Sequence, residues 1–218
     1  MKRTIFALMG FLLAWSGAPG KNLSLAQSGD TYRVTITNLT PGQVITPPVV
    51  IVHSNDFSLF QAGHPASPEL AALAEDGDTG PLATLLADDP RVFDFAVGGG
   101  VILPGESWSV EVSGSGNRHI SAAAMLAVTN DAFIGLDSFR LSPGKTSTID
   151  VPAYDAGSEF NSESCSYVPA CGGGGVHDPA ASEGFVHIHS GIHGIADLDP
   201  AIHDWRNPAA KTTIQKIQ

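Results

Sequence analysis

SAAAMLAVT, at residues 121–129, is the stretch that decides the fold class of this chain. It is apolar almost throughout, as is typical of a strand buried at the centre of a sheet. Around it lie other short segments that are either β-branched runs or alternate apolar and polar residues with the period of a strand. We expect strands at residues 31–39 (TYRVTITNL), 49–52, 107–113, 147–151 and 185–189.

Turn signals separate these segments. Pro-Gly pairs occur at residues 41–42, 104–105 and 143–144, and such pairs favour tight turns between strands. Many short strands joined by turns are typical of two packed antiparallel sheets. The sequence therefore predicts an all-β protein, an antiparallel β-sandwich formed by a single domain at residues 27–218.

One segment departs from this pattern. Residues 67–87 (SPELAALAEDGDTGPLATLLA) contain two short helical stretches interrupted by Gly77 and Gly80. Ser67 is suited to the N-cap, with Pro68 at the first helical position. We expect a short helical insertion here.

The first 26 residues are typical of a secretory signal peptide. Lys2 and Arg3 precede an uncharged apolar run at residues 5–15, which is short for a membrane span, and Ser24-Leu25-Ala26 offers small residues for cleavage. We therefore expect a secreted or periplasmic protein with no transmembrane segment in the mature chain.

The charge balance excludes one class of partner. Without Lys2, Arg3 and Lys21 the chain keeps 8 basic side chains against 22 acidic ones, a net charge of −14. Such a surface repels nucleic-acid phosphates, so nucleic-acid binding is excluded. The same acidity is compatible with cation binding and with solubility alone.

The chain has two cysteines, Cys165 and Cys171. An isolated pair at short spacing in an exported chain predicts a disulfide that closes a small loop.

Acidic residues follow the apolar stretch and recur in a later motif. Asp131 comes directly after the expected central strand, and Asp155 and Glu159 flank Gly157 in YDAGSE. Calcium is bound by several oxygens that adjacent loops supply. Turns also favour acidic residues without any metal, so the spacing alone leaves both interpretations open.

These residues carry a family resemblance. AMLAVTNDAFIGLDSFRL (124–141) followed by PAYDAGSE (152–159) resembles the spondin domain of the F-spondin and mindin family, and HSNDFSLFQAGHPAS (53–67) is similar to bacterial members. The resemblance extends over residues 32–208. It implies a C2-like β-sandwich with a calcium site at its loop end, where the ligands fall on Asp131, Asp155 and Glu159. Family members in animals have Asp at the last position, which here is Glu159.

Histidines form a second cluster in GFVHIHSGIHGIADLD (184–199). His187 and His189 share a face of a strand, and His193 follows on a turn, so the three are a possible zinc or copper site. Alternatively they are outward polar positions, with Val186 and Ile188 directed into the core.

Two functions follow from these observations. The first is a calcium-binding extracellular module for adhesion, with a surface or matrix protein or a glycan as its partner. The alternative is a histidine-based zinc or copper metalloprotein, either an enzyme or a metal carrier. Nucleophile-elbow and phosphate-loop motifs do not occur in the sequence, so we expect no enzyme activity.

Overall fold

Strand β5 (His119–Met125) occupies the middle of a six-stranded sheet, as its apolar composition predicts. The computed structural model describes residues 29–114, 117–142 and 144–218, so the expected signal peptide lies outside the described residues. Every side chain of β5 from Ile120 onward is buried. In sheet order the strands are β3 (Val92–Val97), β2 (Val49–His53), β5, β6 (Ala132–Arg140), β8 (Ala153–Asp155) and β9 (His187–Ile188).

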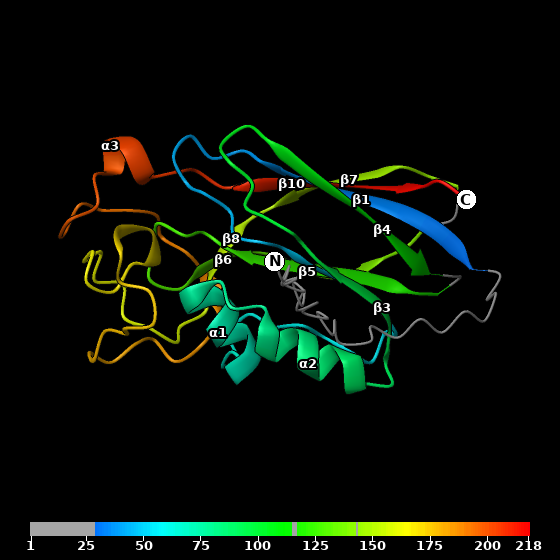
Figure 1. The fold of residues 1–218 in the computed structure, drawn as a ribbon, viewed down its shortest axis with the longest axis horizontal. Helices are drawn as coiled ribbons and strands as arrows, with labels where there is room; N and C mark the ends of the chain where they lie inside the picture. Colours follow the sequence, from blue (N-terminus) through cyan, green and yellow to red (C-terminus); the bar gives the residue numbers. More distant parts are fainter. Residues whose placement is uncertain (1–28, 115–116, 143) are drawn as a thin grey trace, which may run out of the picture.

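A four-stranded sheet packs against this one (Figure 1). Its order is β4 (Ser107–Gly114), β1 (Asp30–Asn38), β10 (Ala210–Lys216) and β7 (Ser147–Val151), and neighbouring strands in both sheets are antiparallel. Apolar and polar residues alternate in β1, and its apolar residues Tyr32, Val34 and Ile36 are buried as expected. The prediction of an all-β sandwich is confirmed.

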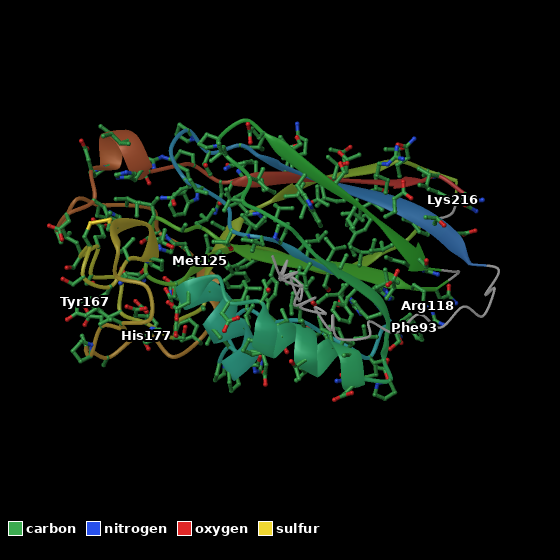
Figure 2. The ribbon with its side chains drawn as sticks, viewed as in Figure 1. Phe93, Arg118, Met125, Tyr167, His177 and Lys216 are labelled. Atoms are coloured by element: carbon green, nitrogen blue, oxygen red, sulfur yellow. A yellow bond between two sulfur atoms is a disulfide. The ribbon has the colours of Figure 1, made fainter. Side chains whose placement is uncertain are left out.

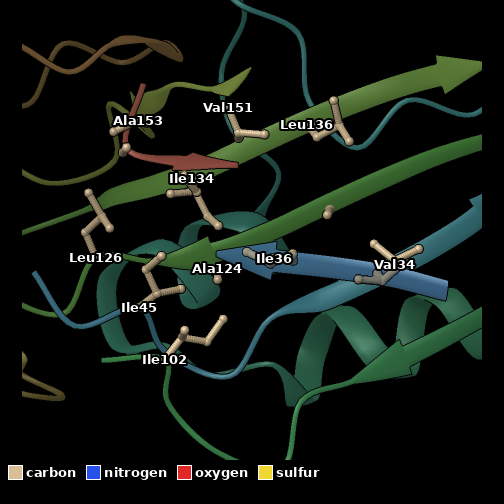
Figure 3. Close-up of a cluster of buried hydrophobic side chains, with 14 of the residues drawn as sticks. Val34, Ile36, Ile45, Ile102, Ala124, Leu126, Ile134, Leu136, Val151 and Ala153 are labelled. Carbon is tan, nitrogen blue, oxygen red and sulfur yellow. The ribbon is translucent and has the colours of Figure 1, made fainter. Parts of the chain in front are cut away.

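The main core fills the space between the two sheets. Figure 3 shows Val34 and Ile36 of β1 facing Ala124 and Ile134 from the other sheet. A second core lies on the opposite face of the six-stranded sheet, which two helices cover (Figure 1). These are α1 (Pro68–Asp76) and α2 (Gly80–Asp88).

The first helix of the insertion has the expected N-cap. The Ser67 side chain accepts a hydrogen bond from the backbone N–H of Leu70, and Gly77 ends α1 with a left-handed φ of 67°. Leu70, Leu73, Leu82 and Leu86 are buried against the sheet. The apolar faces of the two helices explain why β5 is buried on both sides.

Several strands differ from expectation. The central strand ends at Met125 rather than residue 129, and the expected strand at 185–189 is reduced to His187–Ile188. Thr129 causes the early end, because its hydroxyl donates to the Leu126 carbonyl and accepts from the Ala132 N–H, which forms a turn. The apolar runs and alternating segments of the sequence did not predict strands β3, β6, β8 and β10.

Long connections gather at one end of the sandwich, beside α1 (Figure 1). Residues 156–209 contain only the 3₁₀ turn Pro169–Cys171, the short strand β9 and helix α3 (Pro200–His203) as regular elements. We call these residues, together with the turn at residues 126–131 and Asp155 at the end of β8, the loop end. Within the described part of the chain, no helix has the length and apolar character needed to cross a membrane.

Candidate metal centre

Asp131 lies in the turn between β5 and β6, with its side chain fully buried. Its Oδ2 accepts hydrogen bonds from the backbone N–H groups of Ser158 and Glu159, at 2.9 and 3.0 Å. Its Oδ1 is buried and has no hydrogen-bond partner among the described residues. An unpaired buried oxygen costs free energy. A cation bound to Oδ1 would offset this cost.

Asp155 is the last residue of β8 and is also buried. Oδ1 accepts from the Gly157 N–H at 2.7 Å, and Oδ2 accepts from the Asn161 side-chain amide at 2.5 Å. Antiparallel pairing of β6 with β8 places Ala132 opposite Asp155. Two loops at one end of the sandwich thus bring Asp131 and Asp155 near each other.

The electrostatics of these carboxyls disfavour their charged forms. Burial, followed by the charge of Asp155, raises the pKa of Asp131 to about 8. Burial also raises the pKa of Asp155 and the pKa of Glu159. A divalent cation would offset this cost by supplying the missing positive charge.

Glu159 is joined to Asp131 through its backbone, while its carboxylate takes another direction. Oε1 accepts from the backbone N–H of Asp178 at 2.9 Å and from the Asn130 amide at 3.2 Å, and Oε2 lies 3.4 Å from Nδ1 of His177. Of the three acids, Asp131 has an oxygen without a hydrogen-bond partner among the described residues, both oxygens of Asp155 accept hydrogen bonds, and Glu159 also holds the neighbouring loop. Among the described residues, the side chains close enough together to hold a metal include Asp155 but neither Asp131 nor Glu159.

His177 links the loop end to the helical insertion. Nδ1 lies 3.2 Å from a carboxylate oxygen of Glu75, and Nε2 lies 3.6 Å from one of Asp76, both at the end of α1. Figure 2 shows His177 at the loop end, beside α1. No sequence pattern predicts this contact, because about a hundred residues separate its partners.

The histidines of residues 184–199 do not converge as a group of three. His187 and His189 both approach Asp155, where the Nε2 atom of His187 lies 3.7 Å from Oδ1 and that of His189 lies 3.9 Å from Oδ2. The ring of His193 instead contacts the Ser190 hydroxyl at 3.0 Å. The shared face of His187 and His189 agrees with the sequence pattern.

The alternative in which Val186 and Ile188 both face the core is wrong. Val186 is buried, but Ile188 is 53% exposed, and His189 is buried. The strand β9 lies at the edge of the sheet and pairs with β8 only. This edge position turns the histidines toward Asp155 and leaves Ile188 in solvent.

A different set of side chains has the spacing of a metal site. Ligand atoms of Asp155, Glu183 and His187 all lie within 4.8 Å of one another. Sequence reasoning missed Glu183, which stands alone in an irregular loop. Its proximity depends on Gly157, whose carbonyl accepts from the Gly184 N–H at 2.9 Å.

The predicted disulfide between Cys165 and Cys171 is confirmed. It closes a loop whose backbone is tied to neighbouring segments. The Cys165 N–H donates to Asp197 Oδ2 at 2.9 Å, and the Ala170 N–H donates to the carbonyl of Ala127 at 3.1 Å. The disulfide therefore stabilises the loops that surround the acidic residues.

The fold and the site define an all-β sandwich protein with buried acids at its loop end. The family model of the spondin N-terminal domain (Spondin_N) matches residues 39–169, which is more than half of the chain and includes all three acids. The chain belongs to the spondin N-terminal domain family. Residues Glu183 and His187 lie beyond the matched range.

Family membership indicates the general class of protein and its location. It indicates an extracellular binding module, and the disulfide agrees with an extracellular or secreted location. The spondin family is not known for catalysis. A search of curated proteins finds no match to this chain.

Proposed function

We propose that this protein is a secreted adhesion module whose loop end is organised by one calcium ion. Asp131, Asp155 and Glu159 are the proposed ligands, and the partner is a cell-surface or matrix protein or a glycan. The carrying observation is the buried Oδ1 of Asp131, which has no hydrogen-bond partner in the described part of the chain and lies beside the second buried acid, Asp155. Calcium accepts carboxylate oxygens from separate loops, together with backbone carbonyls.

The chemistry of the proposed site is binding rather than turnover. An ion between Asp131 and Asp155 would join the turn after β5 to the end of β8, and Glu159 would extend that link to the loop containing Asp178. A loop end held in one arrangement loses less conformational entropy when a partner binds. The proposed role of calcium is therefore to fix the shape of the binding surface.

The test measures calcium binding and thermal unfolding of the exported, chelator-treated protein. We expect a single calcium per chain by calorimetry. We also expect a melting temperature that rises with calcium, because an ion at a hundredfold excess over its Kd stabilises the fold by about 2.7 kcal/mol. Asp155→Asn should remove most of this rise. Asp150→Asn is the matched control, because Asp150 is exposed on β7 and should leave it unchanged.

Two results would contradict the calcium proposal. If elemental analysis finds no bound calcium and the melting temperature is the same in calcium and in chelator, calcium does not organise the loop end. Equal responses of Asp155→Asn and Asp150→Asn would also contradict the proposal, because the effect of calcium would then come from the acidic surface in general.

A further inference from the structure

The backbone contact of His187 indicates which nitrogen of its neutral ring carries the proton. Nδ1 lies 3.0 Å from the carbonyl oxygen of Ile188, and a carbonyl only accepts, so Nδ1 carries the proton. In the neutral ring Nε2 then has a free lone pair. This Nε2 is buried and has no hydrogen-bond partner among the described residues, although it lies 3.7 Å from Oδ1 of Asp155. Metal-binding imidazoles have this arrangement, in which one nitrogen donates to a carbonyl and the other binds the ion.

Neighbouring groups hold Asp155 in position for the same ion. The Asn161 amide donates to Oδ2 of Asp155 at 2.5 Å, and Oδ1 of Asn161 faces Nε2 of His189 at 3.2 Å. Nδ1 of His189 accepts from the Gly191 N–H at 2.9 Å, so Nε2 of His189 is the protonated nitrogen and donates to Asn161. His189 therefore orients Asn161 and Asp155, and both of its nitrogens are already in use.

We propose that Asp155, Glu183 and His187 form a zinc site at the edge of the six-stranded sheet, next to the proposed calcium ligands. Their ligand atoms lie within 4.8 Å of one another. Zinc binds one nitrogen and two carboxylate oxygens readily and leaves a fourth position for water, whereas calcium prefers oxygen ligands only. Glu183 is exposed and can adjust to the short zinc–oxygen distance.

The two sites share Asp155 and differ in their other ligands. The zinc proposal does not require calcium to bind, since Glu183 and His187 take no part in the calcium proposal. It also replaces the group of three histidines, because His193 contacts Ser190 and His189 is satisfied by Asn161 and Gly191. Of the three proposed zinc ligands, Glu183 is the exposed one, so it forms the solvent side of the site.

The experiment titrates zinc into the full-length, metal-free protein by calorimetry, in wild type and in single variants. We expect one zinc ion per chain, and an affinity that falls by at least about tenfold in His187→Gln and in Glu183→Gln, since even the loss of a group that only supports a ligand costs that much. His64→Gln and His193→Gln are the matched controls and should keep the wild-type affinity. His64 is an exposed histidine on another loop.

Calcium titrations of the same variants distinguish the two proposals. His187→Gln should lose zinc and keep calcium, Glu159→Gln should lose calcium and keep zinc, and Asp155→Asn should lose both. Unchanged zinc affinity in Glu183→Gln and His187→Gln overturns the zinc site, as does an equal loss in His64→Gln. Glu183→Gln keeps the test decisive if His187→Gln fails to fold, because an exposed side chain contributes little to folding.

Discussion

Nε2 of His187 lies 3.7 Å from Oδ1 of Asp155, although the two residues belong to different motifs of the sequence. Pairing of β8 with β9 places these residues directly opposite each other. The acidic motif and the histidine motif therefore meet at one carboxylate. The residues of the two alternative metal interpretations are therefore neighbours in the structure.

Gly157 is the residue on which the approach of these motifs depends. It has a left-handed φ of 64°, and a Cβ there would lie 2.3 Å from the carbonyl oxygen of Phe185. We expect Gly157→Ala to cost about 1–2 kcal/mol from backbone strain and a further 1–3 kcal/mol from the clash. Gly105→Ala, at a φ of 78° with open space around it, should show the strain alone. Equal losses of unfolding free energy in the two variants would contradict this account.

Glu163 is expected to be a structural acid. Its buried carboxylate accepts hydrogen bonds from three consecutive backbone N–H groups, those of His193, Gly194 and Ile195, at 2.6–3.0 Å. Glu163→Gln replaces one acceptor oxygen by a donor, and we expect a loss of about 2–3 kcal/mol in chemical denaturation. The exposed Glu106 provides the control. A loss in Glu106→Gln as large as that in Glu163→Gln would show that the hydrogen bonds contribute nothing specific.

His189 makes stability depend on pH. Burial, with the nearby charges of His187 and His193, lowers the pKa of His189 from 6.5 to about 4. The unfolded imidazole therefore binds a proton before the folded one as pH falls, and stability present above pH 6.5 is lost between about 6.5 and 4. We expect a loss on the order of 3 kcal/mol relative to His189→Gln, measured by denaturation in chelator.

The comparison with the variant is necessary because Asp131 acts in the opposite direction. Its pKa is raised to about 8, so its contribution to stability decreases as pH rises from about 4 to 8. This contribution is present in wild type and in His189→Gln. A difference curve that does not change with pH would contradict the assignment to His189.

The disulfide should contribute modestly. Its loop is short, with a separation of 6 residues, so the chain-entropy model gives about 2 kcal/mol. We expect no free thiols in the denatured, unreduced protein, and a corresponding loss of stability in the double variant Cys165→Ser with Cys171→Ser. Two titratable thiols per chain would contradict the disulfide.

The strand patterns of the sequence predict the fold class, and they place Asp131 directly after a buried strand. Apolar alternation in residues 31–39 and the apolar run at 121–129 depend on burial of one or both strand faces, which is a local property of the pattern. The caps of the helical insertion are also local. Strand β10 was not predicted because it lacks a clear apolar alternation. Its inward positions at Ala210, Thr212 and Ile214 include a small and a polar residue.

Which acidic and histidine side chains lie close together follows from the tertiary structure. Glu183 reaches Asp155 because Gly157 allows the backbone of residues 184–185 to approach, and His177 reaches Glu75 because the loop end folds against α1. Such contacts join residues far apart in the chain, and the periodicity of the sequence does not predict them. The direction of each carboxylate was decided in the same way, because hydrogen bonds from distant backbone N–H groups, and not the spacing of the acids, orient Asp131 and Glu159.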